Sequence, residues 1–168
     1  YGSETQKIFG DANSPDPAAD LNEYAALGTS ETPEISGAVT STGSGIRLYG
    51  NSLSLGSQVE IQFMFKAADI KGCEFRYTIE GQDTVIIPAE DFTPYGNYAY
   101  TLFALKPANF RSDITVGVYN STTGEAVSAV YTVSAEAYSA QFLANNQYTE
   151  LLPAMINYGD AVYAMFGA

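Results

Sequence analysis

The sequence predicts a mainly β protein, an antiparallel Ig-like β-sandwich with a C-terminal helical hairpin packed against it. Short segments between residues 46 and 133 alternate apolar and polar side chains with a period of two, which is typical of strands with one buried face. Turn residues separate these segments at the short spacing expected of a sandwich. After Ser134 the apolar residues recur every three or four positions, which is the period of an α-helix.

The chain has 168 residues, enough for one ordinary domain. We expect residues 1–10 to be the tail helix of a preceding repeat and residues 11–35 to be a linker with a short helix near residues 20–26. Residues 36–133 would then form the sandwich. Residues 134–168 would form helices that belong to the same folded unit.

The expectation of a preceding repeat comes from a similarity between the two ends of the chain. Residues 1–10 and 158–167 align without gaps, and Tyr, Gly, Phe and Gly coincide at the first, second, ninth and tenth positions. A tandem array predicts this similarity, and residues 1–9 would then form a helix like the C-terminal one. Chance recurrence of a Tyr-Gly pair is the alternative.

The alternation predicts about seven or eight strands. Val59 to Phe65 is the clearest case, because every second residue is a large apolar one. Turns are expected at Gly81 to Asp83, Pro94 to Gly96 and Asn120 to Gly124. The expected strand regions are 46–53, 59–65, 75–79, 85–87, 98–103, 114–118 and 127–133.

The C-terminal region predicts two helices joined at Asn145-Asn146. Thr149 can cap the second helix, and Pro153 is tolerated because it lies in or near the first turn. One apolar stripe of this helix should be buried against the sandwich or a neighbouring module. The side chains expected to be largely buried are Leu152, Met155, Val162 and Phe166, with Tyr158 and Phe166 as anchors.

Composition excludes several classes of function. The 19 acidic and 7 basic residues give a net charge of −12, which repels phosphate backbones, so we expect no nucleic-acid partner. We expect no membrane insertion, because no apolar run approaches the roughly 20 residues of a membrane span. Histidine is absent, which removes the commonest general base. Cys73 is the single cysteine, and we expect it to be a buried apolar residue.

Carboxylates offer two candidate sites, each with a plainer explanation. Asp11, Asp16 and Asp20 could bind calcium, but their spacing fits no EF-hand loop and a solvated acidic linker explains them. A glycosidase pair could come from residues 80 and 83 or residues 90 and 91, both acidic, although carboxylates are common in turns. No nucleophile, base and orienting group can be assembled. We therefore expect no catalytic residue, no metal and no cofactor.

Two covalent modifications are compatible with the sequence, and each has a simpler alternative. A lysine isopeptide crosslink would need Lys66 or Lys71 buried beside an acid, whereas exposed lysines at strand ends are the simpler expectation. Asn120-Ser121-Thr122 satisfies the glycosylation sequon but is more simply a hairpin turn.

Tyr95, Tyr98 and Tyr100 are the candidate ligand-binding residues. They lie in the densest aromatic segment, and tyrosine gives large, stiff contact area with a polar tip. The alternative is that the alternation buries Tyr98 and Tyr100 in the core, on the face opposite Phe103. We favour core for these two and exposure for Tyr95, which lies in the expected turn.

The second C-terminal helix resembles a motif close to LNYGAAAQxYF, found in modules of large cell-surface proteins of gut clostridia. Residues 156–166 match it at Asn157, Tyr158, Gly159, Ala161 and Phe166, and depart from it at Asp160, Val162, Tyr163 and Met165. Residues 131–133 with Tyr138, and residues 51–55, also resemble the family. The similarity covers about residues 45–168.

The resemblance implies an address and a class of partner, and no enzymatic activity. It implies an extracellular location, on a Gram-positive bacterial surface or secreted, beside neighbouring repeats of the same chain. Proteins built this way include immunoglobulin-binding proteins of commensals that act as B-cell superantigens. The expected function is thus a module that binds host protein, with immunoglobulin variable regions as the specific partner. A glycan-binding module and a structural spacer are the alternatives.

Overall fold

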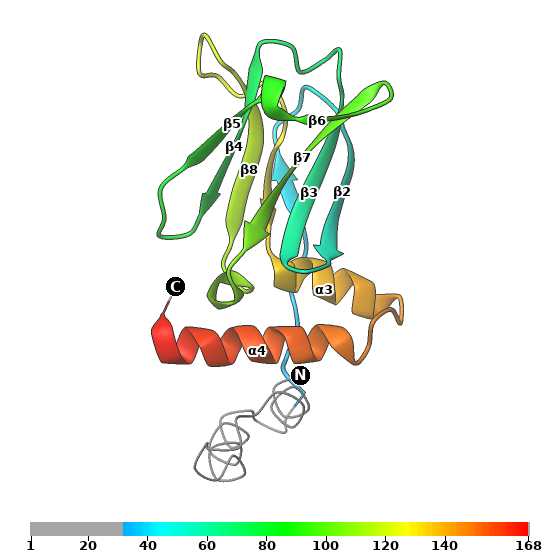
Figure 1. Cartoon of the computed structure of the whole chain (residues 1–168), viewed down its shortest axis with the longest axis vertical. Coiled ribbons are helices and arrows are strands. Elements are labelled where there is room, and N and C mark those ends of the chain that lie inside the picture. The colour runs from blue at the N-terminus through cyan, green and yellow to red at the C-terminus, as the bar shows by residue number, and fades with distance from the viewer. Residues whose placement is uncertain (1–31, 168) are drawn as a thin grey trace, which may run out of the picture. The chain divides into compact units, whose positions relative to one another are not determined.

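Two antiparallel sheets and two helices make up the part of the chain that the computed structural model describes, residues 32–167 (Figure 1). The helices follow the last strand, and both lie at one end of the sheets. The predicted mainly β architecture with a C-terminal helix pair is confirmed. The helices expected at residues 1–9 and 20–26 lie outside the described residues.

The described residues contain nine strands. The larger sheet is formed by β1 (Thr40–Thr42), β4 (Cys73–Ile79), β5 (Val85–Pro88), β8 (Ile114–Asn120) and β9 (Val130–Val133), in the order β1-β9-β8-β4-β5. The smaller sheet is formed by β2 (Leu48–Leu55), β3 (Val59–Lys66), β6 (Thr93–Tyr95) and β7 (Tyr98–Leu105), in the order β2-β3-β7-β6. The remaining elements are η1 (Ala89–Asp91), η2 (Pro107–Asn109), α3 (Ala135–Ala144) and α4 (Leu151–Phe166).

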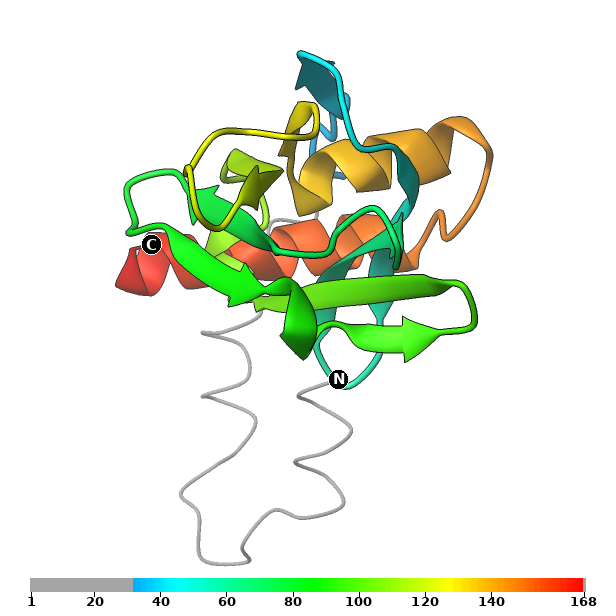
Figure 2. The same ribbon diagram turned by 90° about the horizontal axis from the view of Figure 1, so that it is seen from above.

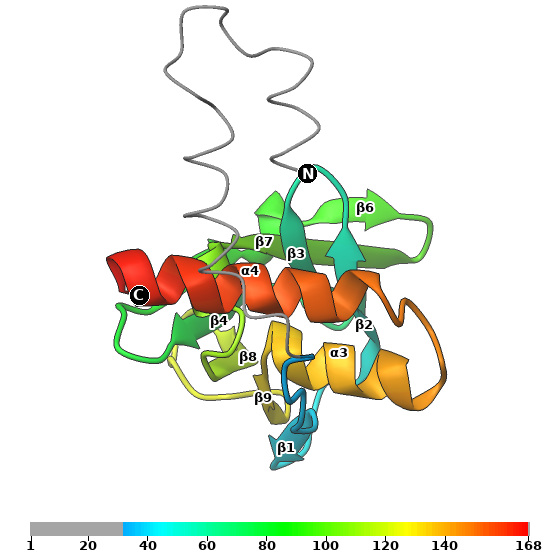
Figure 3. The ribbon, with the colours of Figure 1, turned by 90° about the horizontal axis from the view of Figure 1, so that it is seen from below.

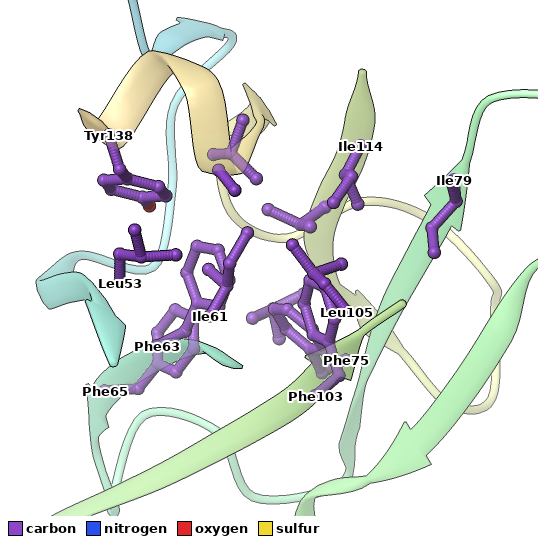
Figure 4. Packing of buried hydrophobic residues seen from close by; sticks show 14 of the residues in the cluster. Leu53, Ile61, Phe63, Phe65, Phe75, Ile79, Phe103, Leu105, Ile114 and Tyr138 are labelled. Carbon is purple, nitrogen blue, oxygen red and sulfur yellow. The ribbon is translucent and has the colours of Figure 1, made fainter. Parts of the chain in front are cut away.

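The two sheets pack face to face around an aromatic core (Figures 2 and 4). The ring centroids of Phe63 on β3 and Phe75 on β4 are 5.2 Å apart, and Tyr77 stacks on Phe103 at 4.0 Å. Of the predicted inward residues of β3, Ile61, Phe63 and Phe65 are buried and Val59 is half-buried. Cys73 is buried as predicted, and burial raises the pKa of its thiol.

The prediction that Tyr98 and Tyr100 face the core is wrong. On β7 the buried side chains are those of the other parity, Ala99, Thr101, Phe103 and Leu105. Pairing with β3 explains the choice, because Phe103 lies directly opposite the buried Ile61. The two tyrosines therefore point away from the core and are half-buried.

The structure differs from the prediction in two short edge strands, β1 and β6, and in the residue at which the last strand begins. The sequence gives no alternation for β1, and β6 occupies the start of the segment expected to be a turn. The last strand begins at Val130 and not at residue 127. Before it, the amide of Val127 donates to the carbonyl of Val118, and the Ser128 hydroxyl accepts from the Val118 amide at 2.9 Å, so this stretch bends out of the regular ladder.

Helix α3 begins with a capped turn and is tied to the smaller sheet. The Ser134 hydroxyl accepts a hydrogen bond from the amide of Ala137 at 3.0 Å, which satisfies one free donor of the first turn. Tyr138 is buried, and its hydroxyl accepts a hydrogen bond from the side-chain amide of Asn51 on β2 at 2.7 Å.

Helix α4 crosses the end of the sandwich between the two sheets (Figure 3). Leu152, Ile156 and Gly159 form its buried stripe, which packs on η2 and the residues around it. A Cβ atom at Gly159 would lie 2.7 Å from the carbonyl oxygen of Pro107 and 2.8 Å from the ring of Phe110. The missing side chain is thus what lets the helix approach this loop.

Several details of α4 correct the prediction. Leu152 is fully buried, but Met155 and Val162 are only half-buried. Phe166 is 77% exposed and Tyr158 is 59% exposed, so neither is an anchor. The close contact at Gly159 sets the rotation of the helix, and that rotation turns Tyr158 outward.

The predicted start of α4 is partly right. Pro153 lies in the first turn, as expected, where its missing amide hydrogen is not needed. Thr149 does not cap the helix. The residue before the helix is Glu150, and no side chain caps the first turn. The carbonyl of Tyr148, which has a φ of 54°, accepts from the amide of Leu152 instead.

Arg111 joins both helices to the segment that enters the first strand. Its Nε and Nη2 atoms donate to the two carboxylate oxygens of Asp160 at 2.6 and 2.9 Å. Its Nη1 atom donates to Glu136 on α3 and to the carbonyl of Glu34. We call Arg111, Asp160, Glu136 and Glu34 the Arg111 cluster. Asp160 is one of the positions that depart from the surface-module motif, and this cluster gives it a structural role.

We expect the substitution Gly159→Ala to destabilise the protein by up to about 2 kcal/mol. The added methyl group must displace the loop at Pro107 and Phe110, which costs about 1–3 kcal/mol, while alanine favours the helix by about 1 kcal/mol. Urea unfolding followed by far-UV circular dichroism measures the difference. Gly56→Ala is the control, because a Cβ there meets nothing within 4 Å, and it should change stability little. Equal stability of the two variants would contradict the close approach.

Because Tyr138 is buried, we expect the folded protein to lose stability at high pH. Burial raises its pKa from 10.0 to about 12, and the hydrogen bond from Asn51 offsets part of this rise. The folded protein holds the phenolic proton more tightly than the unfolded chain does. The corresponding stability, about 2–3 kcal/mol, is present below pH 10 and is lost as the pH rises from about 10 to 12.

We therefore expect Tyr138→Phe to change the dependence on pH. At pH 8 the variant should be less stable than the natural chain by about 1 kcal/mol, because it loses the hydrogen bond. Between pH 10 and about 12 this difference should shrink and then reverse, since phenylalanine has no proton to lose. Urea unfolding at each pH checks this, with Tyr95→Phe as an exposed control that should follow the natural chain throughout.

Candidate functional site

The three tyrosines predicted to bind a ligand lie together on the outer face of the smaller sheet. Tyr95 on β6 pairs directly with Tyr98 on β7, and residues paired across strands share a face. Tyr100 is two residues along the same strand and points the same way. Tyr95 is 67% exposed, as predicted, and the other two are half-buried.

A fourth tyrosine, which the sequence analysis did not single out, joins them. Tyr49 lies where the register between β2 and β3 shifts. Its ring meets that of Tyr98 edge to face, with centroids 5.1 Å apart. We call Tyr49, Tyr95, Tyr98 and Tyr100 the tyrosine face. The signal for Tyr49 was the Tyr-Gly pair that interrupts the alternation of β2, since an interrupted alternation marks a bulge that can re-aim a side chain.

Positive charge borders the tyrosine face, although the chain as a whole is acidic. The guanidinium of Arg47 lies 5.0 Å from the centre of the Tyr49 ring, a cation–π distance. Lys66 lies directly opposite Tyr98 on β3. Neither side chain makes a salt bridge with another described residue. The positions paired with Tyr98 and Tyr100 contain no carboxylate.

The tyrosine face lies on the outside of the smaller sheet, and a hollow borders it at Tyr98. The hollow, of about 660 Å³, is lined by Tyr98, by apolar residues such as Ile70 and Phe92, and by Glu74 and Glu90. A second groove of about 690 Å³ lies between β2, residues 37–41 and α3. This surface could therefore contact a ligand with large aromatic side chains and with the backbone of a strand edge.

The candidate acids lie on the surface, and none belongs to a metal site among the described residues. The carboxylates at positions 80, 83, 90 and 91 are exposed. Within residues 32–167 no group of three or more His, Cys, Asp and Glu side chains could hold a metal ion. The candidate calcium ligands Asp11, Asp16 and Asp20, for which the sequence favours a solvated linker, lie outside the described residues.

The residues considered for covalent modification have ordinary structural positions. Lys66 and Lys71 are both exposed, so neither has the burial that an isopeptide crosslink requires. The side-chain oxygen of Asn120 accepts hydrogen bonds from the amides of Thr122 and Thr123, both at 2.9 Å. Asn120 therefore organises the hairpin turn that the sequence predicted.

Comparison of the chain with protein-family models, with curated proteins and with solved structures finds no match. Neither helix of the described part of the chain is long and apolar enough to cross a membrane.

Proposed function

We propose that this chain is a non-enzymatic binding module that holds a folded protein partner through the tyrosine face. The observation that carries the proposal is the grouping of four tyrosines on one rigid sheet beside two cations without ion-pair partners among the described residues. Tyrosine and arginine are enriched at protein interfaces and at their energetic centres.

The physical argument concerns entropy as much as contact area. Tyrosine has only two rotatable side-chain bonds, so it loses little freedom on binding. Tyr49 and Tyr98 already contact each other, and Arg47 already lies over Tyr49. The centre of the tyrosine face is therefore organised before a partner arrives, which lowers the cost of association.

The edges of the smaller sheet support a second element of the same interface. Strands β2 and β6 are its outer strands, so each has one edge without a neighbouring strand in this sheet. An extended segment of a partner could add to β2 by backbone hydrogen bonds while the tyrosines contact its side chains. Arg47 and Lys66 would favour a neutral or acidic patch on that partner.

Host immunoglobulin variable regions are the first partner to test, within a bacterial surface protein of repeated modules. This part of the proposal rests on the resemblance of residues 156–166 and their context to clostridial surface modules. The Ig-like type of the sandwich, the extracellular location and the neighbouring repeats rest on the same resemblance. Glycan binding and a spacer role remain the competing functions.

Immobilised protein tests these functions directly. Polyclonal immunoglobulin is passed over the immobilised chain, and a glycan array is then probed with the same chain. Retention of antibodies with biased variable-region families, independent of their antigens, supports the proposal. Binding to glycans without retention of immunoglobulin favours the glycan-binding module. Binding in neither assay favours the spacer.

We expect Tyr95→Ala and Tyr98→Ala each to weaken binding of the retained antibodies by at least about tenfold, because truncation of a tyrosine at the energetic centre of an interface costs about 2 kcal/mol or more. Surface plasmon resonance measures the change in Kd, and circular dichroism verifies that the variants fold. Tyr163→Ala is the matched control, since Tyr163 is also more than half exposed but lies on α4. Loss of binding in Tyr163→Ala, with binding kept in Tyr95→Ala, would place the interface elsewhere.

A further inference from the structure

Helix α4 carries two apolar stripes, and the fold fully buries side chains of only one of them. The inner stripe, Leu152, Ile156 and Gly159, is buried. The outer stripe is turned about 100° from it, since each residue advances an α-helix by that angle. It consists of Leu151, Met155, Tyr158, Val162 and Met165.

The outer stripe has the spacing of a helix–helix seam. Its members follow one another at intervals of four, three, four and three residues, which is the heptad pattern of side chains that interlock with another helix. Leu151 is 48% exposed and Met165 is 51% exposed, and Tyr158 is exposed between them. This seam runs along all four turns of α4.

Charge makes α4 the surface where two copies of this acidic chain can meet. Of its sixteen residues only Asp160 carries a charge, and Arg111 already binds that carboxylate with two hydrogen bonds. Elsewhere the net charge of −12 opposes self-association. The seam is thus apolar and locally free of unpaired carboxylates.

A hollow beside the middle of the seam can receive a side chain. It has a volume of about 700 Å³ and lies between α4 and the turn that joins β2 to β3. Its apolar lining includes Val59, Leu105, Phe110, Met155 and Tyr158. The exposed ring of Tyr158 borders it, so the same ring of a second copy would meet it across a two-fold axis.

We propose that two copies of this chain associate through α4, with the outer stripes antiparallel and Tyr158 of each copy beside the hollow of the other. A two-fold axis at Tyr158 places Leu151 of one copy against Met165 of the other, and Met155 near Val162. The antiparallel direction keeps the two Glu150 carboxylates at opposite ends of the seam, whereas a parallel pair would bring them together where α4 has no basic residue. The self-association uses a surface separate from the tyrosine face.

The size of the seam sets the expected strength. A helix of sixteen residues is about 24 Å long. Its seam alone is smaller than a standard protein–protein interface of roughly 1,200–2,000 Å². We therefore expect a weak, transient association, with monomer and dimer in exchange.

Sedimentation velocity of the full 168-residue chain over a range of concentrations tests the proposal. We expect a monomer–dimer equilibrium that strengthens with added salt, because screening reduces the repulsion between two acidic molecules while the apolar seam is unaffected. A chain that stays monomeric up to the highest soluble concentration overturns the proposal.

A pair of matched variants locates the interface. Met165→Glu adds a carboxylate to the seam, and Ile86→Glu adds one to the exposed edge strand β5, where the side chain is 52% exposed against 51% for Met165. Both positions are on the surface, so both variants should fold. We expect Met165→Glu to raise the dimer Kd by at least about tenfold and Ile86→Glu to leave it nearly unchanged. Equal effects of the two substitutions, or a loss only in Ile86→Glu, overturns the assignment to α4.

Discussion

The close approach of α4 to the loop at Pro107 and Phe110 is the constraint on which the C-terminal half of the structure depends. It exists because Gly159 has no side chain, and it fixes both the distance and the rotation of the helix. The rotation decides which apolar stripe closes the end of the sandwich and which one faces outward. The rotation also brings Asp160 to Arg111. Gly159 thus determines both the apolar contact with the loop and the ion pair between Asp160 and Arg111.

The sequence predicted the buried face of a strand well where only every second residue was strongly apolar. In β3, phenylalanine and isoleucine alternate with glutamate and glutamine, so the inward face is unambiguous. In β7 both parities are apolar or aromatic, and the pairing of Phe103 with Ile61 on a distant segment decides between them. The edge strands β1 and β6 bury no side chain, which leaves no alternation to detect.

The same distinction applies to the helix and to the candidate site. In α4 the sequence shows two overlapping stripes, and a glycine contact, not the bulk of Phe166, selects the inner one. The predicted tyrosines could be grouped because they are close in sequence. Tyr49 reaches them only through the register shift in β2, which is a property of strand pairing. Local sequence patterns thus predicted the three tyrosines that are close in sequence. Strand pairing between distant segments added Tyr49 to them.

The Arg111 cluster has a mechanical consequence. Through one guanidinium it connects Glu34, where the chain enters the fold, with Asp160 on the helix where the chain leaves it. A stretching force applied at the two ends of this unit would pass across that guanidinium and would largely bypass the strands. The single hydrogen bond to the Glu34 carbonyl is weaker than the bidentate contact with Asp160, so it would break first, while the two sheets still bore little load. A protein built in this way can lengthen under tension and keep its sheets, with the tyrosine face on them, intact.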